Sequence, residues 1–138
     1  MSSDSGYLIL KNSRTIAARL FMFLLGGKDL VTFCVYLDET DRVLGMTGLY
    51  RYKKDADEAV WLSWFCVAPE VRSRGIGQSL IEHTEKIARG KGFHTIRLYT
   101  STDPNEAAAQ RFYEKNGYRE ISRKKGRCGS MIFREKRL

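Results

Sequence analysis

Two arginines and two glycines lie between a hydrophobic segment and a segment with helical periodicity. They belong to the stretch VAPEVRSRGIGQSL, residues 67–80, and are Arg72, Arg74, Gly75 and Gly77. Glycine lets a phosphate approach the backbone closely, and the first turn of a helix presents unpaired N–H groups and the positive end of its dipole. The residues therefore predict a site for a multiply charged anion such as a pyrophosphate. The alternative is an ordinary strand-to-helix turn with two solvated arginines.

The loop differs from two common phosphate-binding motifs. A P-loop requires Gly-Lys-Ser/Thr, whereas Gly77 is followed by Gln-Ser. A dinucleotide-binding fingerprint requires a third small residue, where this sequence has Leu80. It also requires an acidic residue at the end of the next strand, and residues 95–100 contain none. The pattern that remains is Arg-x-x-Gly-x-Gly, residues 72–77.

A second segment whose residues could take part in a reaction lies further along the chain. It reads AAAQRFYEKNGYREI, residues 107–121, and its period places Tyr113 on a helix that reaches Asn116 and is capped by Gly117. The start of this helix is predicted by an N-cap residue, a proline at the first helical position and a glutamate that closes a capping box: Asp103, Pro104 and Glu106.

Periodicity and turn residues predict the elements that position these two segments. Helices are expected at residues 16–25 and 75–89 and before Asn116, the second of them ending at Gly90 or Gly92. Strands are expected at residues 30–37, 43–52, 59–67, 95–100, 118–123 and 130–137.

The order of these elements predicts an α/β fold. The segment 59–67 is apolar on both faces and is therefore expected at the centre of a sheet. A β-α-β crossover joins it to the strand at 95–100, so these two strands are predicted to be parallel. The rest of the sheet is predicted to be antiparallel, with helices on both faces and a closing hairpin. Without repeats or linkers, residues 1–138 are predicted to form one domain.

The loop and the tyrosine-bearing segment together resemble the GCN5-related N-acetyltransferase (GNAT) superfamily. A strand ending in Val-Ala-Pro-Glu precedes the Arg-x-x-Gly-x-Gly motif. Residues 107–121 look like the family's second segment, a helix that carries a tyrosine and is followed by Gly-Tyr and a strand. The resemblance covers residues 59–121, while the first half agrees only in its strand pattern. It implies a GNAT-like acyl-CoA acyltransferase fold, acetyl-CoA as co-substrate and no metal.

The resemblance also implies which residues bind acetyl-CoA. Backbone N–H groups of the loop would hold the pyrophosphate. The pantetheine arm would enter a gap beside the central strand, where the Val67 amide would polarise the thioester carbonyl. Trp61, Trp64 and Phe65 would shape the floor of that gap where their side chains face it. The implied cofactor-binding residues are Phe65, Cys66, Val67, Arg72, Ser73, Arg74, Gly75, Ile76, Gly77, Gln78 and Ser79, with Asn105 and Tyr113 from the second segment.

Tyr113 matches the general acid of the family. Phenols titrate near ~10 and thiols near ~8.5, so Tyr113 would keep its proton at neutral pH and could donate it to a leaving CoA thiolate. The alternative is a half-buried helix aromatic that packs with Phe112 and Ala109.

Two positions depart from the family pattern. An asparagine seven residues before the tyrosine is replaced here by Glu106, so Asn105, one position away, is the cofactor candidate or a polar residue of the first helical turn. The central strand lacks the usual glutamate base. Glu58 precedes the strand and is either the base or a solvated turn residue, and Ser63 or a water chain could relay the proton. An acceptor with a lower pKa, such as an α-amine at ~7.7–8.0, would need less help.

The composition narrows the possible partners. Residues 119–138 hold eight of the basic side chains and two acidic ones, so they carry most of the net charge of +8. They either attract anions or form a solvated tail. Three scattered cysteines without metal-ligand spacing predict reduced thiols and a cytoplasmic protein. Neither a signal peptide nor an apolar run near the ~20 residues of a membrane span is visible, so no membrane partner is expected.

These observations predict an N-acetyltransferase that moves the acetyl group of acetyl-CoA to a primary amine by direct attack. The amine could belong to a small molecule, a protein or a peptide. A non-catalytic acyl-CoA-binding or regulatory domain is the alternative. A nucleic-acid partner is not favoured, because Tyr118 and Phe133 are the only aromatic residues of the basic segment. Exposed strand edges make a homodimer possible.

Overall fold

The computed structural model describes residues 7–10, 28–55 and 58–138. The predicted helix at 16–25 lies outside these residues. The described strands are β1 Tyr7–Leu10, β2 Lys28–Leu37, β3 Val43–Tyr52, β4 Ala59–Val67, β5 Thr95–Ser101, β6 Arg119–Gly126 and β7 Gly129–Arg137. The described helices are α2 Ile76–Gly90 and α3 Ala107–Lys115, with short 3₁₀ turns at Lys53–Asp55, Pro69–Val71 and Pro104–Glu106.

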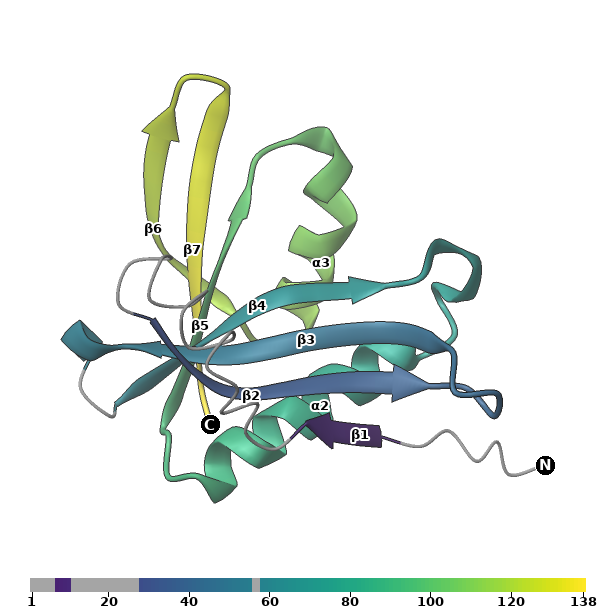
Figure 1. The fold of residues 1–138 in the computed structure, drawn as a ribbon. Coiled ribbons are helices and arrows are strands. Elements are labelled where there is room, and N and C mark those ends of the chain that lie inside the picture. The colour runs from purple at the N-terminus through teal and green to yellow at the C-terminus, as the bar shows by residue number, and fades with distance from the viewer. Residues whose placement is uncertain (1–6, 11–27, 56–57) are drawn as a thin grey trace.

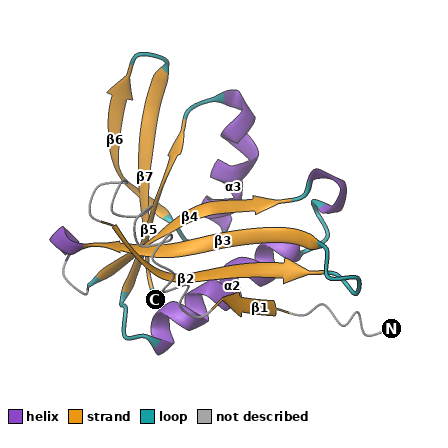
Figure 2. Cartoon of the chain, viewed as in Figure 1, coloured by secondary structure: helices purple, strands orange, loops and turns teal. Residues whose placement is uncertain are grey.

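The strands form one sheet of seven in the order β1-β2-β3-β4-β5-β7-β6 (Figure 2). β4 is central, as its apolar sequence predicts, and it is parallel to β5. The other neighbouring strands are antiparallel. The prediction of a mixed, mostly antiparallel sheet with a central parallel pair is therefore confirmed.

The ends of the elements follow local sequence chemistry. Gly75 precedes α2 with a φ of +83°, and Gly92 follows it with a φ of +87°, a left-handed conformation that glycine adopts without a Cβ penalty. Asp103 caps its turn as predicted, and its carboxylate accepts a hydrogen bond of 2.8 Å from the Asn105 amide. The predicted capping box is wrong, because the Glu106 carboxylate accepts from the Ser101 amide instead. The Asp103 amide, which the glutamate of a capping box would bind, donates instead to the Ser101 hydroxyl at 3.2 Å.

The main core lies between one face of the sheet and both described helices. Its buried residues include Leu49 of β3, Leu62 of β4 and Ile96 of β5. Ile81 and Ala88 of α2 pack against them, and Tyr113 of α3 joins the same cluster. We call this side of the sheet the helix face. Since side chains alternate along a strand, the neighbours Tyr50 and Trp61 point to the other side, where they form a separate aromatic cluster.

The parallel pair separates soon after it begins. β4 and β5 are paired only through Ala59–Thr95, Val60–Ile96 and Trp61–Arg97. Figure 1 shows β5, β7 and β6 diverging from β2, β3 and β4 beyond this point. The remainder of β4, from Leu62 to Val67, therefore has no partner on its β5 side within the described residues.

Candidate active site

A β-bulge reshapes β4 where it separates from β5. Gly48 of β3 pairs with Ser63, and Met46 pairs with Cys66, so Trp64 and Phe65 together oppose Thr47. Trp64 has a φ of +53°, which is rare for a bulky side chain. The bulge turns Phe65 to the helix face, where it contacts Phe112 and Tyr113.

The loop after β4 is held in a defined conformation. The Nε–H of Arg72 donates to the carbonyl oxygen of Val67 at 3.1 Å, which closes the turn around Pro69–Val71. Ser73 and Gly75 both have positive φ, and α2 begins directly after them. The first helical hydrogen bond joins the Ser79 amide to the Gly75 carbonyl oxygen at 3.0 Å. The amides before Ser79 thus lie ahead of the helical ladder, as the first turn of any helix requires.

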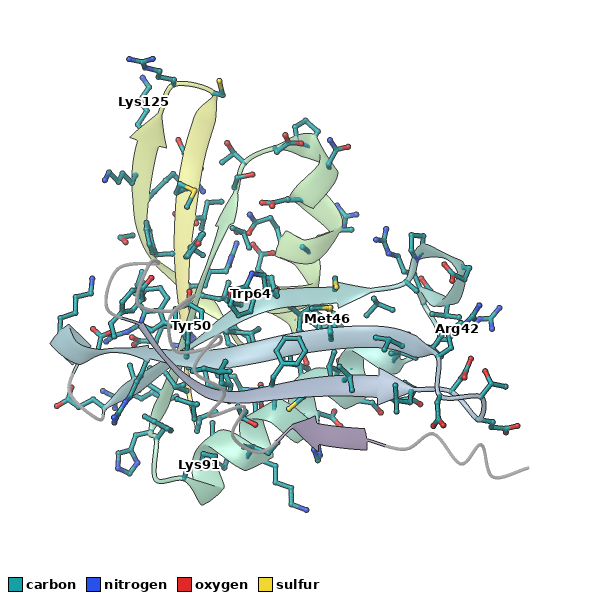
Figure 3. All side chains as sticks on the ribbon, viewed as in Figure 1. Arg42, Met46, Tyr50, Trp64, Lys91 and Lys125 are labelled. Atoms are coloured by element: carbon teal, nitrogen blue, oxygen red, sulfur yellow. The ribbon has the colours of Figure 1, made fainter. Side chains whose placement is uncertain are left out.

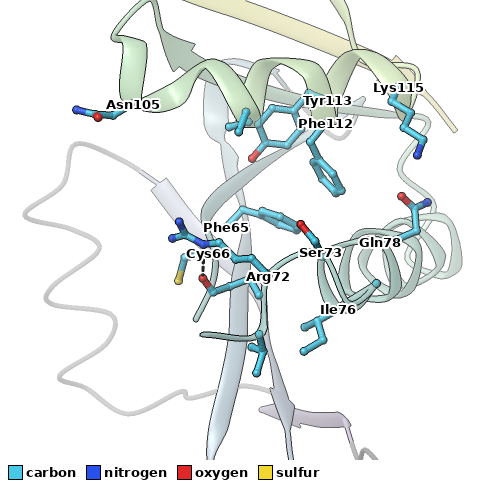
Figure 4. Close-up of a pocket in the computed structure, with 16 residues that line it drawn as sticks. Phe65, Cys66, Arg72, Ser73, Ile76, Gln78, Asn105, Phe112, Tyr113 and Lys115 are labelled. Atoms are coloured by element: carbon cyan, nitrogen blue, oxygen red, sulfur yellow. Dashed lines mark hydrogen bonds between the residues drawn. The ribbon is translucent and has the colours of Figure 1, made fainter. Parts of the chain in front are cut away.

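A pocket of about 530 Å³ lies between this loop, the end of β4 and α3 (Figure 4). Arg72 and Lys115 are the positively charged residues that line it, and Phe65 and Phe112 form apolar wall on the α3 side. The full lining is Phe65, Cys66, Val67, Val71, Arg72, Ser73, Gly75, Ile76, Gly77, Gln78, Asn105, Ala108, Ala109, Phe112, Tyr113 and Lys115. Positively charged and apolar side chains in one pocket suit a ligand with a phosphate group and an acyl arm.

Tyr113 stands in an aromatic cluster on this wall. Its ring lies 6.0 Å from Phe65, 5.6 Å from Phe112 and 5.8 Å from Tyr118, measured between centroids. The residue is 7% exposed, and Figure 4 shows its hydroxyl pointing into the pocket. Burial, and secondarily the charge of Glu106, raises the pKa of Tyr113 above its usual value. The hydroxyl therefore stays protonated at neutral pH.

A side-chain hydrogen bond joins the two helices that border the pocket. The side-chain amide of Gln78 on α2 donates to the Asn116 oxygen at the end of α3 at 2.8 Å, and to Glu82 at 2.7 Å. The Asn116 amide donates in turn to the Phe112 carbonyl oxygen at 2.9 Å. At Gly77, a Cβ would lie 3.6 Å from the Phe112 ring. Gln78 therefore links α2 to the end of α3, and a side chain at position 77 would contact Phe112.

The structure brings most of the predicted cofactor-binding residues to the lining of this pocket. Arg74 and Ser79 are the two that do not line it. Arg74 is exposed in the loop, and Ser79 lies one turn into α2.

The two predicted proton acceptors lie elsewhere. Glu58 is exposed and precedes β4 at the end where β4 still pairs with β5, seven residues from Phe65. At about 3.3 Å a residue, that separation is roughly 23 Å along the strand. Ser63 is half-buried, and as the neighbour of the core residue Leu62 it points away from the helix face. Neither residue lines the pocket.

Sequence reasoning missed five lining residues. Ala109 and Phe112 had been assigned only to packing, and Lys115 had no role. All three lie on α3, which also carries Tyr113. Their spacing from Tyr113 along this helix is the sequence signal that could have placed them in the pocket. Val71 and Ala108 carry no chemical signal in the sequence and line the pocket only through the tertiary arrangement.

Comparison with known proteins identifies the class. The model of the acetyltransferase (GNAT) family matches residues 9–118, and the chain belongs to this family. The family resemblance predicted from the sequence is thereby confirmed. A comparison with curated protein sequences gave no match.

Several solved structures share the fold. A GNAT-family acetyltransferase from Desulfovibrio desulfuricans has a TM-score of 0.78 at 16% identity, covering 96% of this chain and 98% of that chain. A GNAT-family acetyltransferase from Elizabethkingia anophelis with acetyl-CoA bound has a TM-score of 0.73 at 16% identity. The match covers 96% of this chain and 98% of that chain. An aminoglycoside 6'-N-acetyltransferase complexed with coenzyme A has a TM-score of 0.65 at 20% identity, covering 88% and 78%. At these identities the likeness establishes the fold.

The described residues also bear on metal binding and on membrane spans. Within the described residues, no three His, Cys, Asp or Glu side chains converge in a way that could hold a metal ion. In the same part of the chain, no helix is long and apolar enough to cross a membrane.

Proposed function

We propose that this protein transfers the acetyl group of acetyl-CoA to a primary amine. The observation that carries the proposal is the single pocket that joins the start of α2 to the buried hydroxyl of Tyr113. The loop residues from Arg72 to Gly77 would bind the pyrophosphate through backbone N–H groups, aided by the helix dipole. Arg72 and Lys115 add positive charge on the lining of the same pocket.

The chemistry follows from the arrangement around β4. Acetyl-CoA supplies an activated thioester. The unpaired edge of β4 between Phe65 and Val67 would hold the acyl arm, with the Val67 amide at the carbonyl oxygen. The amine attacks the carbonyl carbon and the C–S bond breaks, while Tyr113 donates its proton to the departing sulfur. The nitrogen then gives its surplus proton to water, and Tyr113 regains a proton from water. Asn105 lines the cofactor pocket and remains a candidate contact for the cofactor.

Removal of the proton from the amine needs a separate account. Among the described side chains that line the pocket, none is a carboxylate or an imidazole. We propose that the amine arrives neutral or loses its proton to water, with Ser63 as a relay on the far side of β4. Glu58 is a weaker candidate because of its distance from Phe65.

The proposal includes the setting of the reaction. We place it in the cytoplasm, because Cys34, Cys66 and Cys128 are all free thiols and disulfides are rare there. We also propose that residues 1–138 act as one domain.

Thermal unfolding with and without acetyl-CoA tests the pocket. A site filled to about a hundred times its Kd stabilises the folded state by about 2.7 kcal/mol, which raises the melting temperature of a domain of this size by several degrees. We expect this shift in the parent protein and its loss in Gly75→Glu, which places a carboxylate where the pyrophosphate would bind.

Two variants separate charge from backbone strain in this test. Gly75→Ala forces the same φ of +83° on a side chain, costs about 1 kcal/mol and should keep most of the acetyl-CoA shift. Gly90→Glu adds the same charge at the other end of α2, where a Cβ meets nothing within 4 Å, and should keep all of it. A folded parent that shows no shift would mean that the loop is an ordinary turn and that the proposal is wrong.

A non-catalytic acyl-CoA-binding domain is the second candidate. The absence of a carboxylate from the described pocket lining favours it. Acetyl-CoA stabilisation without turnover of any amine in a broad panel would establish this alternative.

A further inference from the structure

Trp64 is held in a conformation that its own chemistry disfavours. It is a bulky residue with a φ of +53°, and its side chain is 44% exposed although it stands in the central strand. Such strain persists only where the surrounding structure enforces it, and strained residues cluster at functional sites. The cause here is the bulge that places Trp64 and Phe65 opposite one residue of β3.

The indole of Trp64 packs against β3. A Cβ at Gly48 would lie 3.0 Å from Trp64 Cε3, so only glycine leaves room for the ring. The Tyr50 ring lies beside it at 6.3 Å between centroids, as Figure 3 shows near the crossing of β4 and β5. Gly48 and Tyr50 flank the core residue Leu49 and thus point away from the helix face. The indole therefore lies on the side of the sheet opposite the cofactor pocket.

A second exposed aromatic ring stands on the strand that diverges from β4. Tyr99 follows the core residue Leu98 on β5, so it also points away from the helix face, and it is 43% exposed. Its ring contacts Phe133 of β7 at 6.0 Å between centroids. Both Trp64 and Tyr99 lie beyond the last β4–β5 pair, Trp61–Arg97. The two rings therefore stand on the two arms of the opening, on the side from which an acceptor would reach the end of β4.

The carboxylates near this aromatic surface already have partners within the protein. Asp55 and Glu135 both bind Arg97, at 3.3 and 2.9 Å. Asp55 also accepts from the Trp61 indole N–H at 2.7 Å. Both carboxylates are thus engaged within the protein, and the single guanidinium of Arg97 balances the charge of one of them.

We propose that Trp64 and Tyr99 form the acceptor subsite, and that the acceptor is a primary amine joined by a short linker to an aromatic ring. The ring stacks on the indole, and the linker carries the nitrogen through the opening to the carbonyl carbon held at β4. This inference rests on the proposed acetyl transfer.

The test uses two amines that differ in their π face alone. 2-Phenylethylamine and 2-cyclohexylethylamine have the same length and similar bulk. Aromatic pairs gain about 0.5–1.5 kcal/mol beyond area burial, which corresponds to roughly 2- to 12-fold. We expect kcat/KM to favour 2-phenylethylamine by that factor, and the preference to vanish in Trp64→Leu with the KM for acetyl-CoA unchanged. Spermidine should be a poor acceptor.

Two further variants keep the test independent of folding defects. Trp64→Gly removes the ring while glycine accepts the positive φ without strain, so the bulge is retained and the preference should still vanish. Gly48→Ala displaces the indole and should weaken the preference without changing the acetyl-CoA thermal shift.

The outcomes separate the two proposals. Equal kcat/KM for the two amines, a preference for spermidine, or a preference that survives Trp64→Gly would overturn the subsite while leaving acetyl transfer intact. If acetyl-CoA produces no thermal shift in the parent protein, the proposed function is wrong, and the subsite with it.

Discussion

Burial decides how Tyr113 can act. Its hydroxyl lies in an aromatic cluster with Phe65, Phe112 and Tyr118, and the pKa is raised because the anion would be poorly solvated there. A phenol in this setting keeps its proton at neutral pH. In the proposed reaction it would donate a hydrogen bond, and then the proton, to a sulfur that is gaining charge.

The first prediction concerns this hydroxyl. Tyr113→Phe should lower kcat by about 10²- to 10⁴-fold, the usual contribution of a general acid. The acetyl-CoA thermal shift should stay, because the ring remains. Steady-state kinetics beside thermal unfolding measures both. Since the pKa is raised, the parent protein should show no loss of kcat from Tyr113 as the pH rises towards 10, and a fall below that pH would contradict the assignment.

At the scale of elements, β7 is tied to both helices by buried charges. Arg134 is 4% exposed and donates to the Glu114 carboxylate of α3 at 2.8 Å and to the Tyr118 carbonyl oxygen at 3.2 Å. Lys136 lies 2.9 Å from both carboxylate oxygens of Glu85 on α2. Two of the eight basic residues of the C-terminal segment therefore stabilise the fold, and they are not part of a solvated tail.

The second prediction tests the pair on α2. Glu85 also accepts from the Tyr118 hydroxyl at 3.1 Å, so Glu85→Ala leaves Lys136 and that hydroxyl without their acceptor. We expect a loss of about 1–3 kcal/mol in the free energy of unfolding, the usual cost of leaving a buried polar group without its partner. Denaturant unfolding measures it.

A surface pair provides the control. Glu120 and Arg123 are both exposed and lie 3.0 Å apart, and Glu120→Ala should leave the unfolding midpoint unchanged. Equal effects at Glu85 and Glu120 would mean that burial does not strengthen the first pair. Glu85→Ala combined with Lys136→Met should recover part of the loss, because the ammonium group of Lys136 is then no longer left unpaired.

For the whole molecule, tyrosine burial links stability to pH. The pKa of Tyr113 is raised by burial, and so is that of Tyr118, which the neighbouring Glu85 raises further. The pKa of Tyr50 is also raised, again mainly because of burial. The unfolded chain releases these protons near ~10, while the folded protein retains them at higher pH. Above that pH the unfolded state binds fewer protons, so the free energy of unfolding falls as the pH rises.

The third prediction is therefore a loss of stability on the alkaline side. Between pH 9 and pH 11 the free energy of unfolding should fall, with a limiting slope of about 1.4 kcal/mol per pH unit for each such tyrosine. Denaturant titrations at a series of pH values give the slope. Tyr113→Phe should reduce it by one tyrosine's share, and an unchanged slope in that variant would assign the effect to other groups.

The surface of the whole molecule leaves two further expectations open. β6 ends the sheet, and all of its residues are exposed, so the homodimer expected from strand edges would use this strand. With Arg134 and Lys136 engaged inside the fold, less positive charge is available for a nucleic acid than the sequence suggests. Both expectations stay predictions.

The sequence alone determined the elements around the site and the family. Apolar runs and the charged turns between them placed β3 and β4 with the bounds that the structure shows, because local periodicity and turn chemistry depend on neighbouring residues. The Arg-x-x-Gly-x-Gly loop and Tyr113 pointed to the same pocket from segments far apart in the chain. The start of β2 and the role of Glu106 were predicted less well, since pairing partners and turn geometry decide them.

Only the tertiary structure decided which face each side chain of β4 would meet. Simple alternation cannot place Trp64 and Phe65, because the bulge adds a residue to one strand of a pair and reverses the pattern after it. Trp61 and Trp64 had been expected near the gap together with Phe65, yet Phe65 alone lines the cofactor pocket. The pairing of β4 with β3 fixes the bulge, and the separation of β4 from β5 opens the site. Both features depend on contacts between segments that lie far apart in the sequence.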